Sequence, residues 1–156
     1  MEYGGANLLC LANQPSSSGS TDTADTQKKS YIFGVQFQFG EANLLNAPSG
    51  NYFNAFCSVC KRNGKSSTVM LPGQTACPKG WNNEYRGFLM APRTSLKRSQ
   101  YICVDESTEL RDGSFKKSRV AGYLNFVETR CGSNDIPCRS KDYIENYEVA
   151  CVVCSV

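Results

Sequence analysis

The chain has 156 residues, a formal net charge of +3 and nine cysteines, but no histidine. A chain of this length forms about one domain and can bury roughly 70% of the surface that its unfolded form exposes, so it can fold with few crosslinks. The absence of histidine excludes Ser-His-Asp and Cys-His catalysis and imidazole metal sites. The small net charge excludes nucleic acid as a default partner. Glycosidase chemistry needs only two carboxylates, so the absence of histidine does not exclude it. We nevertheless expect a protein that is not an enzyme and holds no cofactor.

The cysteine count points to a compartment. Nine cysteines exceed what stability alone requires at this size, which favours an oxidising, extracellular location where disulfides persist. No segment has the roughly 18 apolar residues of a membrane span, and residues 1–10 lack the charged and apolar regions of a secretory signal. We expect a secreted, already processed chain without membrane insertion, in which residues 1–156 form a single extracellular domain.

The N-terminal region divides into an arm and a polar segment. The arm carries Cys10 beside Leu8, Leu9 and Leu11, which indicates that it is tied to the core. Residues 14–30 read QPSSSGSTDTADTQKKS and have almost nothing apolar to bury. They are predicted to be an exposed polar loop within the domain.

The rest of the chain is predicted to be all-β, a single compact, disulfide-stapled domain of short antiparallel strands. Residues 31–39 give the clearest strand, because Phe33, Val35, Phe37 and Phe39 alternate with polar or small residues such as Gln36. Shorter candidate strands, bounded by Gly, Pro, Asn or Asp, are residues 67–71, 84–91, 100–104, 120–128 and 148–156. Little helix is expected beyond one short helical turn in residues 140–147.

The cysteines allow four disulfides and one unpaired thiol. Their pairing is open, because eight cysteines alone allow about 105 connectivities. Two C-x-x-C pairs, at 57–60 and 151–154, could instead supply a structural zinc site or a redox pair. Zinc ligand pairs usually lie closer in sequence, and both segments are predicted to be β-strands, whereas a reactive thiol needs a helix N-terminus. Disulfides are therefore favoured.

Two groups of charged residues can be interpreted either as solvated surface loops or as binding sites. Asp105, Glu106, Glu109 and Asp112 form an acidic segment that is predicted to be a solvated loop; calcium binding stays open, although EF-hand spacing is absent. Basic residues would form an anion site for a sulfated polysaccharide if their loops converge, and otherwise keep the protein soluble. They are Lys61, Arg62, Lys65, Arg93, Lys97, Arg98, Arg111, Lys116, Lys117 and Arg119.

Several motifs occur in one order along nearly the whole chain. They are GGANLLCL at 4–11, CSVC at 57–60, MLPG at 70–73, CPKGW at 77–81, EYRGFLM at 84–90, YICVD at 101–105, CGS through PC at 131–138, and CVVC at 151–154. This ordered set resembles the C-terminal non-collagenous domain of the short-chain, spongin-like collagens of invertebrates. More distantly, the Cys-Pro-x-Gly and Tyr-x-Gly-aromatic signature resembles the non-collagenous domain of type IV collagen, a β-rich fold that assembles into trimers and network nodes.

The resemblance implies a secreted matrix or adhesion domain that acts through self-association and partner binding. The partners expected are a second copy, as a dimer or trimer, and matrix proteins or glycans. The chain has no Gly-X-Y repeat, so trimerisation by a triple helix cannot be assumed. Family members carry a further upstream cysteine, which makes Cys10 the first candidate for the unpaired residue. The bridges would then use Cys57, Cys60, Cys77, Cys103, Cys131, Cys138, Cys151 and Cys154.

The alternative function is a carbohydrate-binding lectin on the same scaffold. Its candidate ligand-binding residues are Trp81, Asn82, Asn83, Glu84, Tyr85 and Arg98. Aromatic side chains such as Trp81, Tyr85 and Phe88 belong to the core in the ordinary case, and would stack on a sugar ring or a partner if they formed an exposed platform.

Overall fold

The computed structural model describes residues 6–16, 32–39, 44–46, 52–64, 67–96, 98–110, 117, 121–132 and 143–156. Within these residues the chain forms strands and no helix, which confirms the all-β prediction. The strands are β1 (Val35–Gln38), β2 (Tyr52–Asn54), β3 (Thr68–Pro72), β4 (Asn82–Ala91), β5 (Ile102–Asp105), β6 (Gly122–Phe126) and β7 (Ala150–Ser155).

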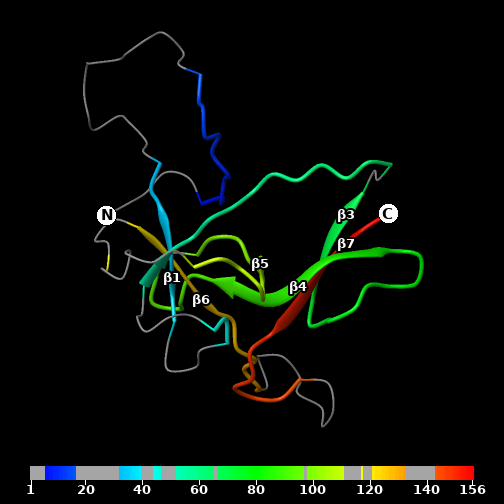
Figure 1. Cartoon of the computed structure of the whole chain (residues 1–156). Coiled ribbons are helices and arrows are strands. Elements are labelled where there is room, and N and C mark those ends of the chain that lie inside the picture. Colours follow the sequence, from blue (N-terminus) through cyan, green and yellow to red (C-terminus); the bar gives the residue numbers. More distant parts are fainter. Residues whose placement is uncertain are drawn as a thin grey trace.

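The seven strands form one sheet in the order β2-β1-β6-β4-β7-β3, with β5 paired to β4. Strand β4 connects two halves of this sheet. It pairs with β7 over residues 82–88, with β5 over residues 87–90, and with β6 at Met90 and Ala91. In Figure 1 this long strand runs from the side of β3 and β7 to the side of β1 and β6. All pairings are antiparallel except β1 with β6, which is parallel, so the expectation of antiparallel strands alone was wrong at this pair.

Six of the predicted strands are present with shifted ends, and one strand was missed. The segment at 31–39 shortens to β1, while Tyr31 lies outside the described residues. The missed strand is β2, whose three residues are too few to show an alternation. The helical turn expected at 140–147 is a β-turn in its described part, since the Tyr147 N–H donates to the Ile144 carbonyl at 3.3 Å and Asn146 has φ of 63°.

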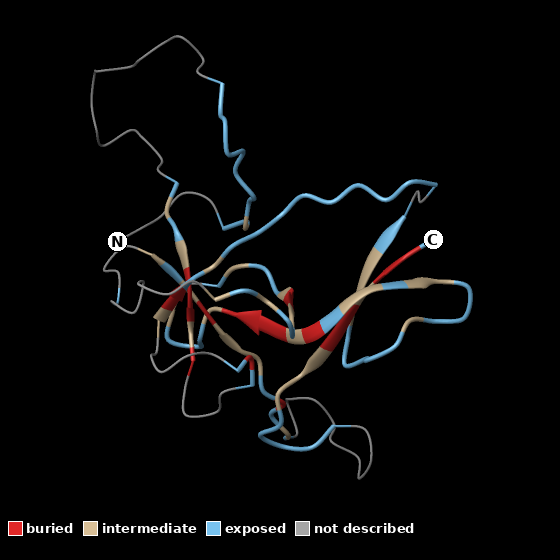
Figure 2. Ribbon diagram, viewed as in Figure 1, coloured by how far each residue is buried: buried red, intermediate tan, exposed pale blue. Residues whose placement is uncertain are grey.

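Buried side chains gather into two clusters. The first, which we call the aromatic core, lies mainly on β1, β2, β6 and the end of β4, and comprises Phe37, Phe39, Leu45, Phe53, Met90, Val104 and Leu124. The second, the cysteine core, contains Leu89, Cys103 and Cys151, with Met70, Tyr85, Val127, Val149 and Val153 packed against it. Figure 2 shows the buried positions along β1, β7 and the C-terminal half of β4.

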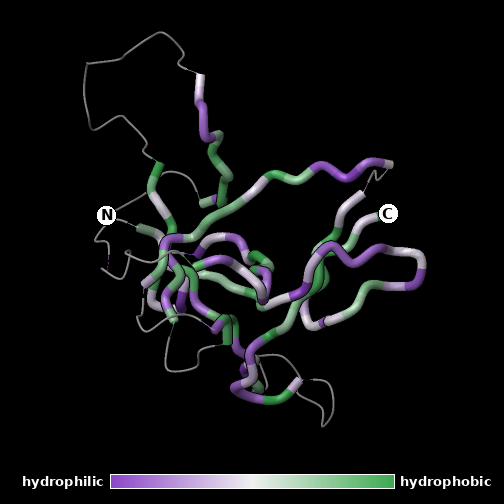
Figure 3. Tube along the Cα trace, in the orientation of Figure 1, coloured by the Kyte–Doolittle hydropathy of each residue, from purple (hydrophilic) through white to green (hydrophobic). Residues whose placement is uncertain are grey.

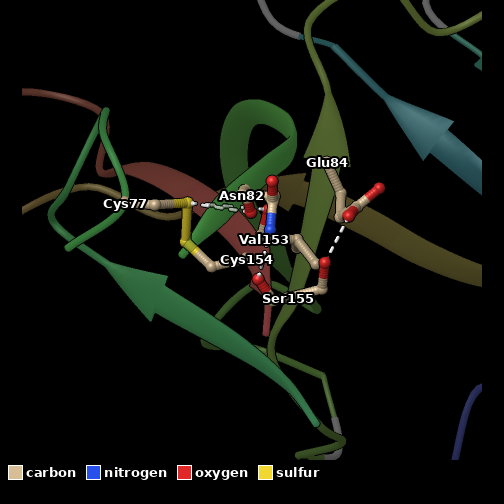
Figure 4. Close-up of a disulfide and its surroundings, with 6 residues drawn as sticks. All are labelled: Cys77, Asn82, Glu84, Val153, Cys154 and Ser155. Atoms are coloured by element: carbon tan, nitrogen blue, oxygen red, sulfur yellow. Dashed lines mark hydrogen bonds between the residues drawn. A yellow bond between two sulfur atoms is a disulfide. The ribbon is translucent and has the colours of Figure 1, made fainter. Parts of the chain in front are cut away.

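The link between β3 and β4 crosses β7. Both strands pair antiparallel to β7, so residues 73–81 must return along its length before β4 begins. Gly73 starts this crossover with φ of +72°, a conformation that residues with a Cβ rarely adopt. Cys77 then forms a disulfide with Cys154 of β7 (Cα–Cα 5.8 Å), which fixes the crossover to the strand that it crosses (Figure 4).

Strand β7 is held from both faces. Successive side chains of a strand point to opposite faces, so two residues that are three apart, such as Cys151 and Cys154, lie on opposite faces. They therefore cannot bond to each other, and each bonds to a different partner. Cys154 bonds to the crossover, and Cys151 bonds to Cys103 of β5 (Cα–Cα 5.8 Å). Both cysteines of this C-x-x-C pair are fully buried. The C-x-x-C spacing in β7 therefore places one disulfide on each face of the strand.

Gly87 lets β4 and β5 approach closely. A Cβ at this position would lie 1.8 Å from the Val104 carbonyl oxygen and 2.7 Å from the Glu106 nitrogen, both backbone atoms. A backbone clash of this kind cannot be relieved by rotating a side chain. The glycine of the Tyr-x-Gly-aromatic motif is thus required by the pairing of β4 with β5.

The disulfides correct one prediction. Cys10 is not the unpaired residue: it bonds to Cys57 (Cα–Cα 5.6 Å), and Cys60 is free and exposed. The segment that carries Cys57 and Cys60 has no regular structure, so the strand expected there is also wrong. Cys131 is disulfide-bonded as well, and Cys138 lies outside the described residues.

The N-terminal arm is attached at two points, as expected. Leu8 packs against the aromatic core and Cys10 is bonded to Cys57, whereas Leu9 and Leu11 remain exposed. Residues 14–16 of the predicted polar loop are exposed, and residues 17–30 lie outside the described part of the chain. Figure 3 also shows the segment between β2 and β3 changing from apolar to hydrophilic on its way to β3.

Candidate functional site

Five of the six predicted ligand-binding residues, Trp81 to Tyr85, lie together at the start of β4. A β-bulge between Asn83 and Tyr85 shifts the register against β7, so the strand alternation is interrupted at Glu84. Trp81 is half-buried and ends the crossover, where its N–H donates to the Pro78 carbonyl at 3.0 Å. Asn83 is exposed. The sequence therefore located a real cluster, but burial and the bulge decide what it can bind.

Most polar groups of this cluster already bind other parts of the chain. The Asn82 amide donates to the Ser155 carbonyl at 3.3 Å. The Ser155 hydroxyl donates to the Glu84 carboxylate, as Figure 4 shows, and Arg62 forms an ion pair with the same carboxylate at 3.1 Å. Both contacts use Oε1 of Glu84, so this carboxylate joins β4 to β7 and to the segment before β3.

Tyr85 and Phe88 belong to the core. Tyr85 packs in the cysteine core and its hydroxyl donates to the Cys103 carbonyl at 3.2 Å. Burial raises the pKa of Tyr85 above its usual value of 10.0, with smaller contributions from the charge of Asp105 and from Cys60. Phe88 packs against the aromatic core. Neither ring forms an exposed stacking platform.

Arg98 is exposed in the segment between β4 and β5. Among the described residues, no hydrogen bond or ion pair joins it to Asn82, Glu84 or Tyr85. The six predicted residues thus split into a cluster used for internal contacts, an exposed Asn83 and a separate exposed arginine.

The zinc and redox alternatives are wrong. Three of the four sulfurs of the two C-x-x-C pairs, those of Cys57, Cys151 and Cys154, are in disulfides and cannot act as thiolate ligands. Within the described ranges, no group of three or more Cys, Asp or Glu side chains is placed to hold a metal ion. The remaining thiol, Cys60, lies on an irregular segment, and the part of the chain that the structure describes has no helix beside it.

The acidic segment after β5 is solvated and locally bonded. Asp105 accepts a hydrogen bond from the Ser107 N–H at 2.9 Å, as in an Asx turn. Glu106 pairs with Arg86 at 2.8 Å, and the carboxylate of Glu106 raises the pKa of Arg86 through this hydrogen bond and its charge. Asp112 lies outside the described residues, so the calcium prediction is untested.

The basic loops can be located only in part. Lys61, Arg62, Arg93, Arg98 and Lys117 are exposed. The other five predicted basic residues, Lys65, Lys97, Arg111, Lys116 and Arg119, lie outside the described part of the chain. Arg62 is engaged with Glu84, and the convergence of the loops stays a prediction.

Sequence reasoning missed a polar surface on the other half of the sheet. The strands β2, β1 and β6 bury Phe53, Phe37 and Leu124 on one face, and their opposite face carries amides and tyrosines. We call it the amide–tyrosine face; its members are Gln36, Gln38, Tyr52, Asn54, Tyr123 and Asn125. The alternation of Gln36 and Gln38 was its one signal in the sequence, because β2 was not predicted and the register of β6 beside β1 cannot be deduced from pattern.

No family model matches this chain, and no solved structure matches it. The described residues include no helix with the length and hydropathy to span a bilayer. The disulfide-rich β domain itself is compatible with an extracellular role.

Proposed function

We propose that this chain is a secreted, non-catalytic domain of the extracellular matrix, related to the terminal domains of short-chain collagens, and that it works by self-association through the outer edge of β3. The motifs that carry the resemblance have structural roles that support the proposal. Gly73 begins the crossover, Cys77 staples it to β7, and Gly87 admits β5. Because each of these motifs has a structural role at its own place in the fold, the fold accounts for their order along the chain.

The observation that carries the proposal is the outer edge of β3, which no strand among the described residues covers. This strand ends the sheet order, and no strand of the described residues pairs with its outer side. Ser67 and Val156 exchange two backbone hydrogen bonds, at 3.3 and 3.1 Å. Since inward and outward groups alternate in an antiparallel pair, Val69 and Leu71 also face β7, while Thr68 and Met70 direct their N–H and C=O groups outward.

An edge of this kind pairs readily with another chain. Natural edge strands are usually blunted by charged residues, bulges or proline, and β3 has only Pro72 at its end. Two copies related by a two-fold axis at Met70 could exchange hydrogen bonds between the two Met70 residues, and donate from Thr68 of each copy to Pro72 of the other. Pro72 lacks an N–H, which limits this pairing to the length of β3.

The test removes the outward donors and leaves the β7 ladder intact. Thr68→Pro deletes an exposed outward N–H at the first position of the strand, where proline is tolerated, and is the deciding variant. Met70→Pro deletes the central outward N–H but also removes a side chain that packs against the cysteine core. Thr68→Val, which keeps the N–H, is the matched control. Light scattering and sedimentation equilibrium should show an oligomer for the wild type and for Thr68→Val, and a dissociation constant raised about tenfold or more in the proline variants.

A wild-type chain that stays monomeric up to its solubility limit would contradict the proposal. So would a folded Thr68→Pro variant that associates as tightly as Thr68→Val. Circular dichroism and non-reducing peptide mapping on the same samples establish that the variants are folded.

A further inference from the structure

The amide–tyrosine face consists of two rows that cross three strands. The pairing register places Asn54, Gln36 and Tyr123 side by side on β2, β1 and β6. One step along the strands, Tyr52 and Gln38 are opposite each other, and Asn125 continues this row on β6. Alternation along each strand puts all six on the face opposite Phe37, Phe53 and Leu124.

Hydrogen bonds hold these side chains in place. The Gln36 amide donates to the Asn54 side-chain oxygen at 3.1 Å, and the Gln38 amide donates to the Tyr52 hydroxyl at 3.4 Å. Asn125 donates to the Gln38 carbonyl at 3.1 Å, and its own side-chain oxygen is buried without a hydrogen-bond partner. The amides are therefore ordered before any ligand arrives, which lowers the entropic cost of binding.

Two aromatic rings lie among the amides. The centroids of Tyr52 and Tyr123 are 5.7 Å apart with an interplanar angle of 59°, and both side chains are partly exposed. The pKa of Tyr123 is raised, first by burial and then by Tyr52, while the positive charge of Arg93 acts in the opposite direction. An arginine thus lies near this face, in the loop that follows β4.

We propose that the amide–tyrosine face binds a neutral glycan. The exposed amide of Asn54 and the half-buried amide of Gln38 offer donors and acceptors to adjacent sugar hydroxyls, whereas Gln36 is buried and supports Asn54 from below. The partly exposed rings of Tyr52 and Tyr123 offer apolar faces for the C–H groups of a pyranose. With strands about 4.8 Å apart and a repeat of about 6.8 Å along each strand, the face measures about 10 by 7 Å, enough for one or two sugar rings.

The composition of the face favours a neutral glycan over the other partners. None of its six positions is charged, although 20% of the chain's residues are, so a sulfated or uronic ligand would find its counter-charge only at Arg93 and the loops. Protein interfaces are centred on buried apolar anchors, which the face lacks apart from its two tyrosine rings. This site would give the proposed matrix domain a partner, but it does not depend on self-association, because it lies on the strands at the opposite end of the sheet from β3.

The experiment screens the full chain on an array of neutral oligosaccharides, including linear glucose, mannose and N-acetylglucosamine oligomers, followed by calorimetry with the strongest of these. Tyr123→Ala and Asn54→Ala should each weaken binding about tenfold or more, because one removes a ring and the other an exposed amide. Tyr123→Phe keeps the ring and should lose less than Tyr123→Ala. Tyr147→Ala removes a tyrosine that is 62% exposed outside the face, and should bind as the wild type does.

Three results would overturn the proposal. The first is no binding to any neutral oligosaccharide, and the second is unchanged binding in both folded variants, Tyr123→Ala and Asn54→Ala. The third is binding to sulfated glycans only, abolished by salt, which would assign recognition to the basic loops. Light scattering on the same samples separates this outcome from that of the self-association test: Thr68→Pro should still bind the glycan.

Discussion

The two halves of the sheet are stabilised by different means. On the side of β1, β2 and β6, large rings fill the space: Phe39 lies 5.4 Å from Phe53 and 5.7 Å from Phe126 between ring centroids, and Phe126 lies 5.4 Å from Phe88. On the side of β3, β7 and the start of β4, the described disulfides of Cys151 and Cys154 hold strands whose neighbours are only partly buried. Covalent bonds thus add to packing in the half with the smaller buried cluster.

The largest expected effect comes from emptying the aromatic core. Phe53 is fully buried, so Phe53→Ala should reduce the free energy of unfolding by about 3–5 kcal/mol through lost packing and the cavity left behind. The measurement is denaturant unfolding without reductant. Phe56→Ala is the matched control, since this ring is three residues further on and 49% exposed, and it should cost far less. Equal losses in the two variants would contradict the burial of Phe53 in the aromatic core.

Removing the disulfide of the other half should have the next largest effect. Cys103→Ala with Cys151→Ala should cost about 2–4 kcal/mol. The Cys10–Cys57 bridge provides a sharp comparison, because its ends are 47 residues apart and those of Cys103–Cys151 are 48 apart. The chain-entropy terms are therefore equal.

The difference between the two double variants measures packing alone. Cys103 and Cys151 are buried, whereas Cys10 and Cys57 are exposed. We expect the loss of the buried bridge to cost more, by the cavity that its sulfurs leave. If the two double variants have the same stability in denaturant, packing around the cysteine core contributes nothing beyond the crosslink.

Local pattern was enough to predict most strands but not their arrangement. The strands β3, β4 and β7 are bounded by glycine, proline or polar residues and show their period in sequence, so their positions were predicted to within about two residues. The parallel pairing of β1 with β6 was not predictable, because these strands are more than eighty residues apart and nothing local specifies their register. The β2 strand is too short to carry a signal.

The candidate site was also predicted only as far as local sequence allows, because contacts between distant segments are not visible in the sequence. Trp81 to Tyr85 are adjacent in sequence, which suggested a shared surface. The carboxylate of Glu84 is instead occupied by Ser155, 71 residues away, a contact that only the fold creates. The unpaired cysteine was likewise misassigned to Cys10, because the resemblance implied that its partner lies further upstream. Cys10 instead meets Cys57 on an irregular segment, 47 residues away, and Cys60 is left free.

A smaller effect is expected at the hydroxyl of Tyr85, which links β4 to β5 inside the cysteine core. Tyr85→Phe loses the hydrogen bond to the Cys103 carbonyl and should cost about 0.5–1.5 kcal/mol at neutral pH. Tyr101→Phe alters an exposed tyrosine and should change stability by less than about 0.5 kcal/mol.

The pH dependence of this variant tests the same contact. Since burial raises the pKa of Tyr85 in the folded state, its contribution is fully present below the unfolded value of 10.0 and is lost as pH rises through the folded value. Denaturant unfolding between neutral pH and pH 11 or so should therefore show a steeper alkaline loss in the wild type than in Tyr85→Phe. Parallel curves would mean that the hydroxyl is solvated.

The smallest effect on stability, and the sharpest test of the cysteine assignment, concerns Cys60. In the described part of the chain it is the free thiol, and it is exposed, so Cys60→Ser should change the free energy of unfolding by less than about 0.5 kcal/mol. Iodoacetamide added to the native protein should modify Cys60, while Cys10 and Cys57 stay unmodified because they are bonded. Peptide mapping that found the label on Cys10, with Cys57 or Cys60 in the bridge to another residue, would contradict the pairing. On gradual reduction, Cys10 and Cys57 should be labelled before Cys103 and Cys151, because a thiolate reductant must reach a sulfur to attack it, and only the first pair is exposed.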